Sequence, residues 1–157
     1  MTPAVAVAKE AKIKYTLHEY DHDPAVRAFG LEASEKLGID PTRIYKTLVI
    51  DLGDLNLAVA VVPVAVQLDL KAVAKAFGVK KVFMADKKRV EKTTGYIVGG
   101  VSPLGQKKRL ATLIDISAQD LEMIWVSAGR RGLQICLAPA DLADLTQGQF
   151  FSIARKD

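Results

Sequence analysis

The chain has 157 residues, of which half are hydrophobic and a quarter are charged. This length fits one domain with a sizeable core, and the composition excludes disordered and low-complexity proteins. No apolar run approaches the roughly 18 uncharged residues that a membrane span needs, and the N-terminus lacks the pattern of a secretion signal, so we expect a cytoplasmic protein with no membrane partner.

The net charge of +4 hides an asymmetry along the chain. Residues 71–109 carry 11 Lys and Arg against 2 Asp and Glu, which is half of all the positive charge. Clustered like charges repel each other unless a partner neutralises them, so this segment favours a polyanion; a solvated surface is the alternative. Few aromatic residues accompany the lysines, which favours contact with a phosphate backbone over base stacking.

Periodicity and capping residues predict the helices and strands in the first half of the chain. Thr2 is a favoured N-cap and Gly38 a favoured helix end. The expected elements are helices over 3–11 and 31–37, a half-buried strand over 14–20 that ends at Tyr20, and a β-hairpin over 44–64.

The second half mixes short helices and strands. Asp69 and Asp86 are N-caps of two basic helices. The expected elements are helices over 70–77, 87–94 and 140–145, a helical turn over 117–121, strands over 81–85 and 111–116, and a hairpin over 123–137. There is no regular βαβ alternation, so the sequence predicts a single α+β domain, 1–157, with a mixed, mostly antiparallel sheet or partial barrel surrounded by helices.

Metal and nucleophile chemistry is disfavoured by the residues available. His18 and His22 are the only histidines, too few for a usual zinc site, so we expect no metal and no cofactor. The single cysteine, Cys136, lies in a strand-like run and fits a small core residue better than a nucleophile.

Lys46 is the strongest single candidate for a functional residue. In a strand, alternate side chains share a face, so Lys46 lies on the face of Leu48 and Ile50. A lysine among core-type residues is costly to desolvate unless an anion or a carbonyl dipole meets it. An exposed lysine at a strand end is the alternative.

The segment from Gly95 to Arg109, GYIVGGVSPLGQKKR, predicts a shaped loop joined to positive charge. Such a loop lets a ligand approach the backbone closely and suits anionic or carbonyl-bearing ligands. The segment lacks the Gly-Lys-Ser/Thr ending of a P-loop, which disfavours nucleoside triphosphates. An ordinary turn before a strand is the alternative.

Several long motifs occur in order along nearly the whole chain: MTPAV at the start, HDP at 22–24, YKTL at 45–48, PVAVQLDLK at 63–71, TGYIVGGVSPLGQKKR at 94–109 and VSAGRRGL at 126–133. Together they resemble the YbaK family, which is similar to the editing domain of bacterial prolyl-tRNA synthetases. The resemblance implies a trans-editing deacylase that removes cysteine from mischarged tRNA(Pro), with tRNA and prolyl-tRNA synthetase as partners and no role for DNA.

The resemblance also implies roles for particular residues. Lys46 is the essential pocket lysine, and Gly99 and Pro103 belong to a G-x-x-x-P loop that holds the ester end. The expected substrate-binding residues are Tyr20, Phe29, Thr47, Gly100, Ser127 and Gln134. The expected tRNA-binding residues are Lys71, Lys75, Lys80, Lys81, Lys107, Lys108 and Arg109. From the residues alone, Tyr20 and Phe29 fit core aromatics and Ser127 a strand end equally well.

The implied mechanism needs no protein nucleophile, because the thiol of the substrate cysteine attacks its own ester carbonyl. Loop amides and Lys46 then stabilise the developing oxyanion. One departure concerns specificity: Gln134 stands where the family has an aspartate, and a neutral amide holds an ammonium less strongly. Cysteine bound more weakly, or another small amino acid such as alanine, is therefore expected. A non-catalytic tRNA- or synthetase-binding module and a hydrolase of another small ester or thioester are the alternatives.

Overall fold

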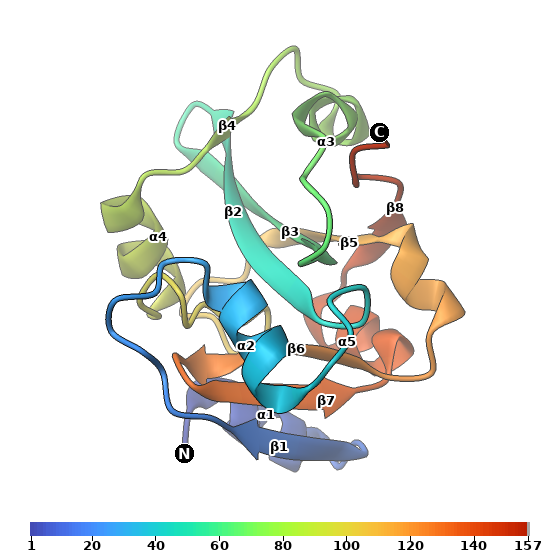
Figure 1. The fold of residues 1–157 in the computed structure, drawn as a ribbon. Helices are drawn as coiled ribbons and strands as arrows, with labels where there is room; N and C mark the ends of the chain where they lie inside the picture. The colour runs from blue at the N-terminus through green and yellow to red at the C-terminus, as the bar shows by residue number, and fades with distance from the viewer. Residues whose placement is uncertain (157) are drawn as a thin grey trace.

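The computed structural model describes residues 1–156, which form five α-helices, one 3-10 helix and eight strands (Figure 1). The helices are α1 (Pro3–Ala11), α2 (Phe29–Leu37), α3 (Leu70–Phe77), α4 (Lys87–Thr94), η1 (Ile116–Asp120) and α5 (Pro139–Thr146). The strands are β1 (Tyr15–Glu19), β2 (Tyr45–Gly53), β3 (Asn56–Pro63), β4 (Phe83–Met84), β5 (Ala111–Asp115), β6 (Ile124–Arg130), β7 (Leu133–Leu137) and β8 (Gln149–Phe151).

The strands divide between two open sheets. The smaller sheet has the order β1-β7-β6 and is antiparallel throughout. The larger sheet has the order β4-β2-β3-β5-β8, antiparallel on the β2 side and parallel from β3 to β8. The α+β prediction is therefore confirmed, with the strands shared between two sheets that do not close into a barrel.

The predicted helix ends depend on local hydrogen bonds that the structure contains. The side chains of Thr2, Asp69 and Asp86 each accept a hydrogen bond from the backbone N–H three residues later. Gly38 takes the left-handed conformation at the end of α2. The helix α2 itself begins at Phe29, two residues earlier than the periodicity predicts, and its N-cap, Ala28, has no capping side chain.

The two sheets meet along β2. At the start of β2, Ile44 forms a parallel bridge with Trp125 of β6, and the Trp125 N–H donates to the Arg43 carbonyl at 3.1 Å. At the far end of β2, Ile50 and Asp51 pair with β4. Because both neighbours lie on the same edge of β2, this edge is unpaired in the middle of the strand.

Two hydrophobic clusters fill the molecule. The larger one includes Tyr45 and Val49 of β2 with apolar side chains of α1 and of the β6–β7 hairpin. The smaller one lies against α3 and includes Ile50, with Leu48 packed against it. This division confirms the predicted alternation of faces along β2. Over residues 1–156, no helix combines the length and the apolar character needed to cross a bilayer.

Candidate functional site

A cavity of about 430 Å³ lies at the unpaired edge of β2. Its walls come from β2, the start of α2, the β6–β7 hairpin and the loop from Gly95 to Arg109, called the glycine loop below. The structure brings six of the predicted site residues to this cavity: Phe29, Lys46, Thr47, Gly99, Ser127 and Gln134.

The middle of β2 offers unpaired backbone groups to this cavity. Val49 accepts a hydrogen bond from the Ala85 N–H at 3.0 Å, on the edge of β2 that faces away from β3. The backbone groups of alternate residues in a strand point to the same edge, so those of Thr47 also point there. Neither β4 nor β6 pairs with Thr47. The cavity therefore contains a short stretch of free strand edge.

Lys46 is half-buried on the opposite side of the backbone from Tyr45 and Thr47. Within residues 1–156, its ammonium forms no ion pair and no hydrogen bond. Desolvation lowers the pKa of Lys46 below its usual value. A lysine without a partner at the wall of a cavity is a site for an anion or a polarised oxygen.

Two buried oxygen atoms at the cavity also lack partners in the described part of the chain. They are the hydroxyl oxygen Oγ1 of Thr47 and the amide oxygen Oε1 of Gln134. Gln134 is 7% exposed and pairs across the smaller sheet with Ser127 of β6 and His18 of β1. An unsatisfied buried acceptor costs about 1–3 kcal/mol, so both oxygens favour a ligand that donates hydrogen bonds.

Tyr20 lies beside Gln134 and does not line the cavity. Its backbone N–H donates to the Gly132 carbonyl at 2.9 Å, which ties the end of β1 to the hairpin. Burial raises the pKa of the Tyr20 hydroxyl, and the backbone of Gly132 and the amide of Gln134 offset part of this rise. Tyr20 therefore contacts Gln134, which lines the cavity, without lining the cavity itself.

The glycine loop meets the cavity near one end only. Gly99 lines the cavity with a φ of 93°, whereas Gly100 is buried against the backbone of Arg130. A side chain at Gly100 would approach Arg130 to 2.8 Å. Pro103 is buried and lines a separate cavity of about 210 Å³ together with Arg109. The structure thus does not bring Gly100 and Pro103 to the main cavity.

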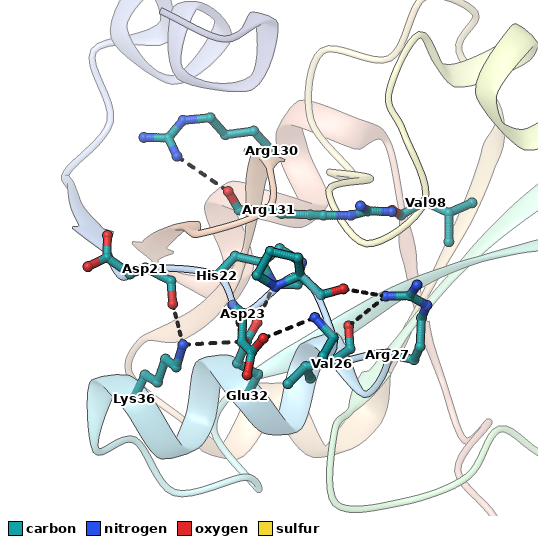
Figure 2. A network of polar contacts seen from close by, with 12 residues as sticks. Asp21, His22, Asp23, Val26, Arg27, Glu32, Lys36, Val98, Arg130 and Arg131 are labelled. Carbon is teal, nitrogen blue, oxygen red and sulfur yellow. Dashed lines mark hydrogen bonds and ion pairs between the residues drawn. The ribbon is translucent and has the colours of Figure 1, made fainter.

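A polar network that the sequence reasoning missed lies at α2 and the segment before it (Figure 2). Glu32 of α2 is buried and accepts hydrogen bonds from His22 Nδ1 at 2.6 Å and from the Asp23 N–H at 2.8 Å. It also pairs with Lys36 at 3.3 Å. These contacts, led by the hydrogen bond from His22, overcome the effect of burial and lower the pKa of Glu32. The segment before α2 is thereby fixed to the helix.

Two arginines without a predicted role lie at this site. Arg27 lines the cavity and donates to the Pro24 carbonyl at 2.8 Å. Arg131 stacks on the ring of Phe29 at 4.8 Å and donates two hydrogen bonds to the Val98 carbonyl. The motif VSAGRRGL contains Arg131, but only the folded chain shows that it contacts the glycine loop.

The predicted tRNA-binding residues lie outside the cavity. All seven are exposed and none lines it: Lys71, Lys75, Lys80, Lys81, Lys107, Lys108 and Arg109. Cys136 is buried in β7 away from the cavity, and burial raises the pKa of its thiol. Residues 1–156 contain no group of three or more His, Cys, Asp or Glu side chains that could hold a metal ion.

Comparison with known proteins supports the sequence resemblance. The family model of the aminoacyl-tRNA editing domain matches residues 23–145. A protein of Enterococcus faecalis, EbsC, named as a candidate Cys-tRNA(Pro)/Cys-tRNA(Cys) deacylase, is 44% identical over 99% of this chain and 94% of its own length. YwhH of Bacillus subtilis, which is uncharacterized, is 25% identical over 80% of each chain.

Two solved structures share the fold. A candidate trans-editing enzyme for prolyl tRNA synthetase is 23% identical, with a TM-score of 0.81 over 99% of both chains. The hypothetical protein APE2540 is 21% identical, with a TM-score of 0.87 over 98% of this chain and 99% of its own. These findings confirm the predicted fold and the predicted class of enzyme, an editing deacylase. The chain belongs to the aminoacyl-tRNA editing domain family.

Proposed function

We propose that this chain, as one editing domain over residues 1–157, deacylates Cys-tRNA(Pro) in the cytoplasm. The observation that carries the proposal is the content of the cavity. A lysine and two oxygen acceptors that have no partner among residues 1–156 lie together with a glycine backbone. These groups complement the polar parts of an aminoacyl ester. The relative EbsC, which is 44% identical to this chain over the aligned residues, is named as a candidate deacylase of Cys-tRNA(Pro) and Cys-tRNA(Cys).

The acceptors fit the amino group of the substrate. The α-ammonium of an aminoacyl ester has three N–H donors, and Thr47 Oγ1 and Gln134 Oε1 are two buried acceptors without partners in the described part of the chain. Lys46 and the backbone of Gly99 offer positive charge and a donor for the ester carbonyl. The proposal therefore assigns the substrate ammonium to Thr47 and Gln134, and the ester carbonyl to Lys46 and Gly99.

The cavity favours chemistry by the thiol of the substrate. No histidine or cysteine is among the described residues that line it, and the hydrogen bond that Ser127 Oγ forms there is accepted from the Gly129 N–H at 3.2 Å. In the proposed step, the substrate sulfur forms a bond to the ester carbon and the ester C–O bond breaks. The thiol proton leaves with the tRNA hydroxyl, and water later opens the cyclic thioester. Holding the thiol beside its own carbonyl supplies proximity in place of an enzyme nucleophile.

Gln134 is the proposed determinant of substrate range. Its amide is neutral, so it holds the ammonium less strongly than a carboxylate would. We infer that cysteine is bound more weakly than by a site with an acid here, or that alanine is accepted as well. We also propose that prolyl-tRNA synthetase acts as a partner, since the predicted tRNA-binding residues lie outside the cavity.

The direct test is the rate of Cys-tRNA(Pro) deacylation by the wild type, by Lys46→Ala and by buffer alone, with and without prolyl-tRNA synthetase. The proposal predicts that the wild type accelerates release and that Lys46→Ala does not. A wild-type rate equal to that of buffer, even with the synthetase present, would instead support a non-catalytic binding module.

Salt dependence separates the proposal from a hydrolase of other small esters. Binding of tRNA to exposed lysines should weaken steeply with rising salt, because bound counterions are released. A small ester such as cysteine methyl ester has no phosphates, so its hydrolysis should change little with salt. Equal salt dependence for the two substrates would argue that the basic surface is merely solvated.

A further inference from the structure

Arg131 clamps one peptide group of the glycine loop. Its Nε donates to the Val98 carbonyl at 3.0 Å and its Nη2 donates to the same oxygen at 2.7 Å (Figure 2). The same guanidinium stacks on the Phe29 ring at 4.8 Å. Arg131 thus joins the hairpin, the start of α2 and the glycine loop beside the cavity.

The clamp determines the direction of the next N–H group. The Val98 carbonyl and the Gly99 N–H belong to one planar trans peptide, so they point in opposite directions. With the carbonyl held toward Arg131, the Gly99 N–H points away from it. Gly99 and Val98 line the cavity, whereas Arg131 does not.

Only the middle one of three consecutive N–H groups is free. The Val98 N–H donates to Glu91 Oε2 at 3.0 Å, and the Gly100 N–H donates to the Ile97 carbonyl at 2.9 Å. The Gly99 N–H forms no hydrogen bond within residues 1–156. Its neighbours are thus occupied within the loop, while this donor is left for a ligand.

The space around Gly99 is too small for a side chain. An added Cβ would lie 2.8 Å from Arg131 Nε and 2.8 Å from Phe29 Cε1. The guanidinium and the ring therefore pack directly on the Cα of Gly99. This contact and the two hydrogen bonds to the Val98 carbonyl together restrict rotation of the peptide.

We propose that Arg131 is a positioning residue, which orients the Val98–Gly99 peptide so that the Gly99 N–H donates to the ester carbonyl oxygen in the transition state. The inference rests on the proposed deacylase function. Preorganised backbone donors of this kind stabilise developing oxyanions because they need no reorganisation during the reaction. Arg131 itself does not touch the substrate.

Kinetics of Arg131→Ala, Arg131→Lys and the control Arg130→Gln on Cys-tRNA(Pro) test this role. Arg130 is the exposed neighbour, whose side chain pairs with Glu19 at 2.9 Å and donates to the Arg131 backbone carbonyl at 3.3 Å, but not to the glycine loop. We expect kcat to fall about 100-fold in Arg131→Ala with KM within about twofold, because misplacement near the reacting atoms costs about that much. In Arg131→Lys the decrease in kcat should be smaller, because lysine keeps a charged donor. Some decrease should remain, because lysine lacks the planar fork of donors. Arg130→Gln should match the wild type.

Chemical rescue distinguishes positioning from general stability. Free guanidinium at low, non-denaturing concentration should restore part of kcat in Arg131→Ala and none in Lys46→Ala. An unchanged kcat in Arg131→Ala would overturn the proposal. So would a loss of activity that follows a lowered Tm and is not rescued by guanidinium.

A spectroscopic measurement keeps this test separate from the proposed function. Amide NMR of Arg131→Ala should show shifts centred on residues 98–100, with the signals of the remaining chain close to those of the wild type. A wild type that deacylates nothing would defeat the proposed function, while these shifts would still report the clamp. An unmoved Gly99 amide signal in the variant would defeat the clamp itself.

Discussion

The wall of the cavity and the basic segment 71–109 use charge in opposite ways. At the cavity, one half-buried lysine, Lys46, has no partner within residues 1–156, and the neighbouring acceptors are neutral oxygens. In the basic segment, many lysines are exposed and none of the predicted tRNA contacts reaches the cavity. An interaction in a desolvated site is stronger and less screened by salt than one at the surface. We infer from this difference that the cavity controls chemistry and the surface controls tRNA affinity.

The largest effect should come from Lys46→Met, which removes the charge and keeps the length of the side chain. We expect kcat on Cys-tRNA(Pro) to fall by about 10²–10³, the usual decrease when a donor to a developing oxyanion is removed. Lys14→Met, at an exposed lysine outside both regions, is the control and should keep the wild-type rate. Equal rates for Lys46→Met and the wild type would show that the cavity does not control chemistry.

The same variant should be more stable than the wild type, because desolvation lowers the pKa of Lys46 in the folded state. Between this lowered pKa and the ordinary value of 10.5, the unfolded chain binds more protons than the folded one, so stability rises with pH in that window. Below the window the full cost of the buried charge is present. Urea unfolding at several pH values should show that Lys46→Met loses this contribution to the pH dependence; an identical dependence would contradict it.

The next largest effect concerns Gly99, compared with Gly38 as a matched glycine. Both have a positive φ, but an added Cβ at Gly38 meets nothing within 4 Å. Gly38→Ala should therefore cost only backbone strain of about 1 kcal/mol, and Gly99→Ala roughly 2–4 kcal/mol because overpacking is added. Urea unfolding measures both. Equal decreases in stability would mean that Arg131 and Phe29 do not pack on Gly99 as described.

A change in selectivity of about tenfold is expected from Gln134→Asp. A carboxylate in place of the amide should hold the substrate ammonium more strongly, by about the 1–1.5 kcal/mol that separates charged from neutral hydrogen bonds. The measurement is kcat/KM for Cys-tRNA(Pro) and Ala-tRNA(Pro) with each protein. No change for either substrate would rule out the role of Gln134 in specificity.

The smallest effect should come from the surface. In Lys107→Gln combined with Lys108→Gln, we expect KM for tRNA to rise a few-fold while kcat stays constant, because lysines that bind phosphates position the substrate without entering the reaction. The slope of log affinity against log salt should fall by about 1 for each phosphate that is no longer neutralised. An unchanged slope would remove these two lysines from the tRNA interface.

Features that depend on neighbouring residues could be predicted from the sequence, whereas contacts between distant residues could not. Helix caps such as Asp69 and the alternation of faces around Lys46 depend on neighbours within a few residues, and the structure confirms both. The free edge at Thr47 could not be predicted, because it exists only since β6 contacts the start of β2 and β4 pairs with its far end. Contacts between distant residues, such as Arg131 with Val98, leave no periodic signal.

The residues of the candidate site could be predicted mainly from the family resemblance. Phe29, Ser127 and Gln134 come from three separate elements, and no spacing rule brings them to Lys46. The resemblance grouped them, and the structure places them around one cavity. It also grouped Pro103 with Gly99, although folding buries Pro103 at another cavity. Proximity in sequence within the loop was therefore a poor guide to proximity at the site.

The measurement that tests the central claim most directly compares Cys-tRNA(Pro) with Ser-tRNA(Pro), whose side chains differ only in sulfur against oxygen. In the proposed mechanism the cavity supplies donors and position, and the substrate thiol supplies the nucleophile. The wild type should therefore accelerate release of cysteine strongly and leave serine near its uncatalysed rate. Equal acceleration of both substrates would contradict the mechanism and would show that the protein directs water to the ester.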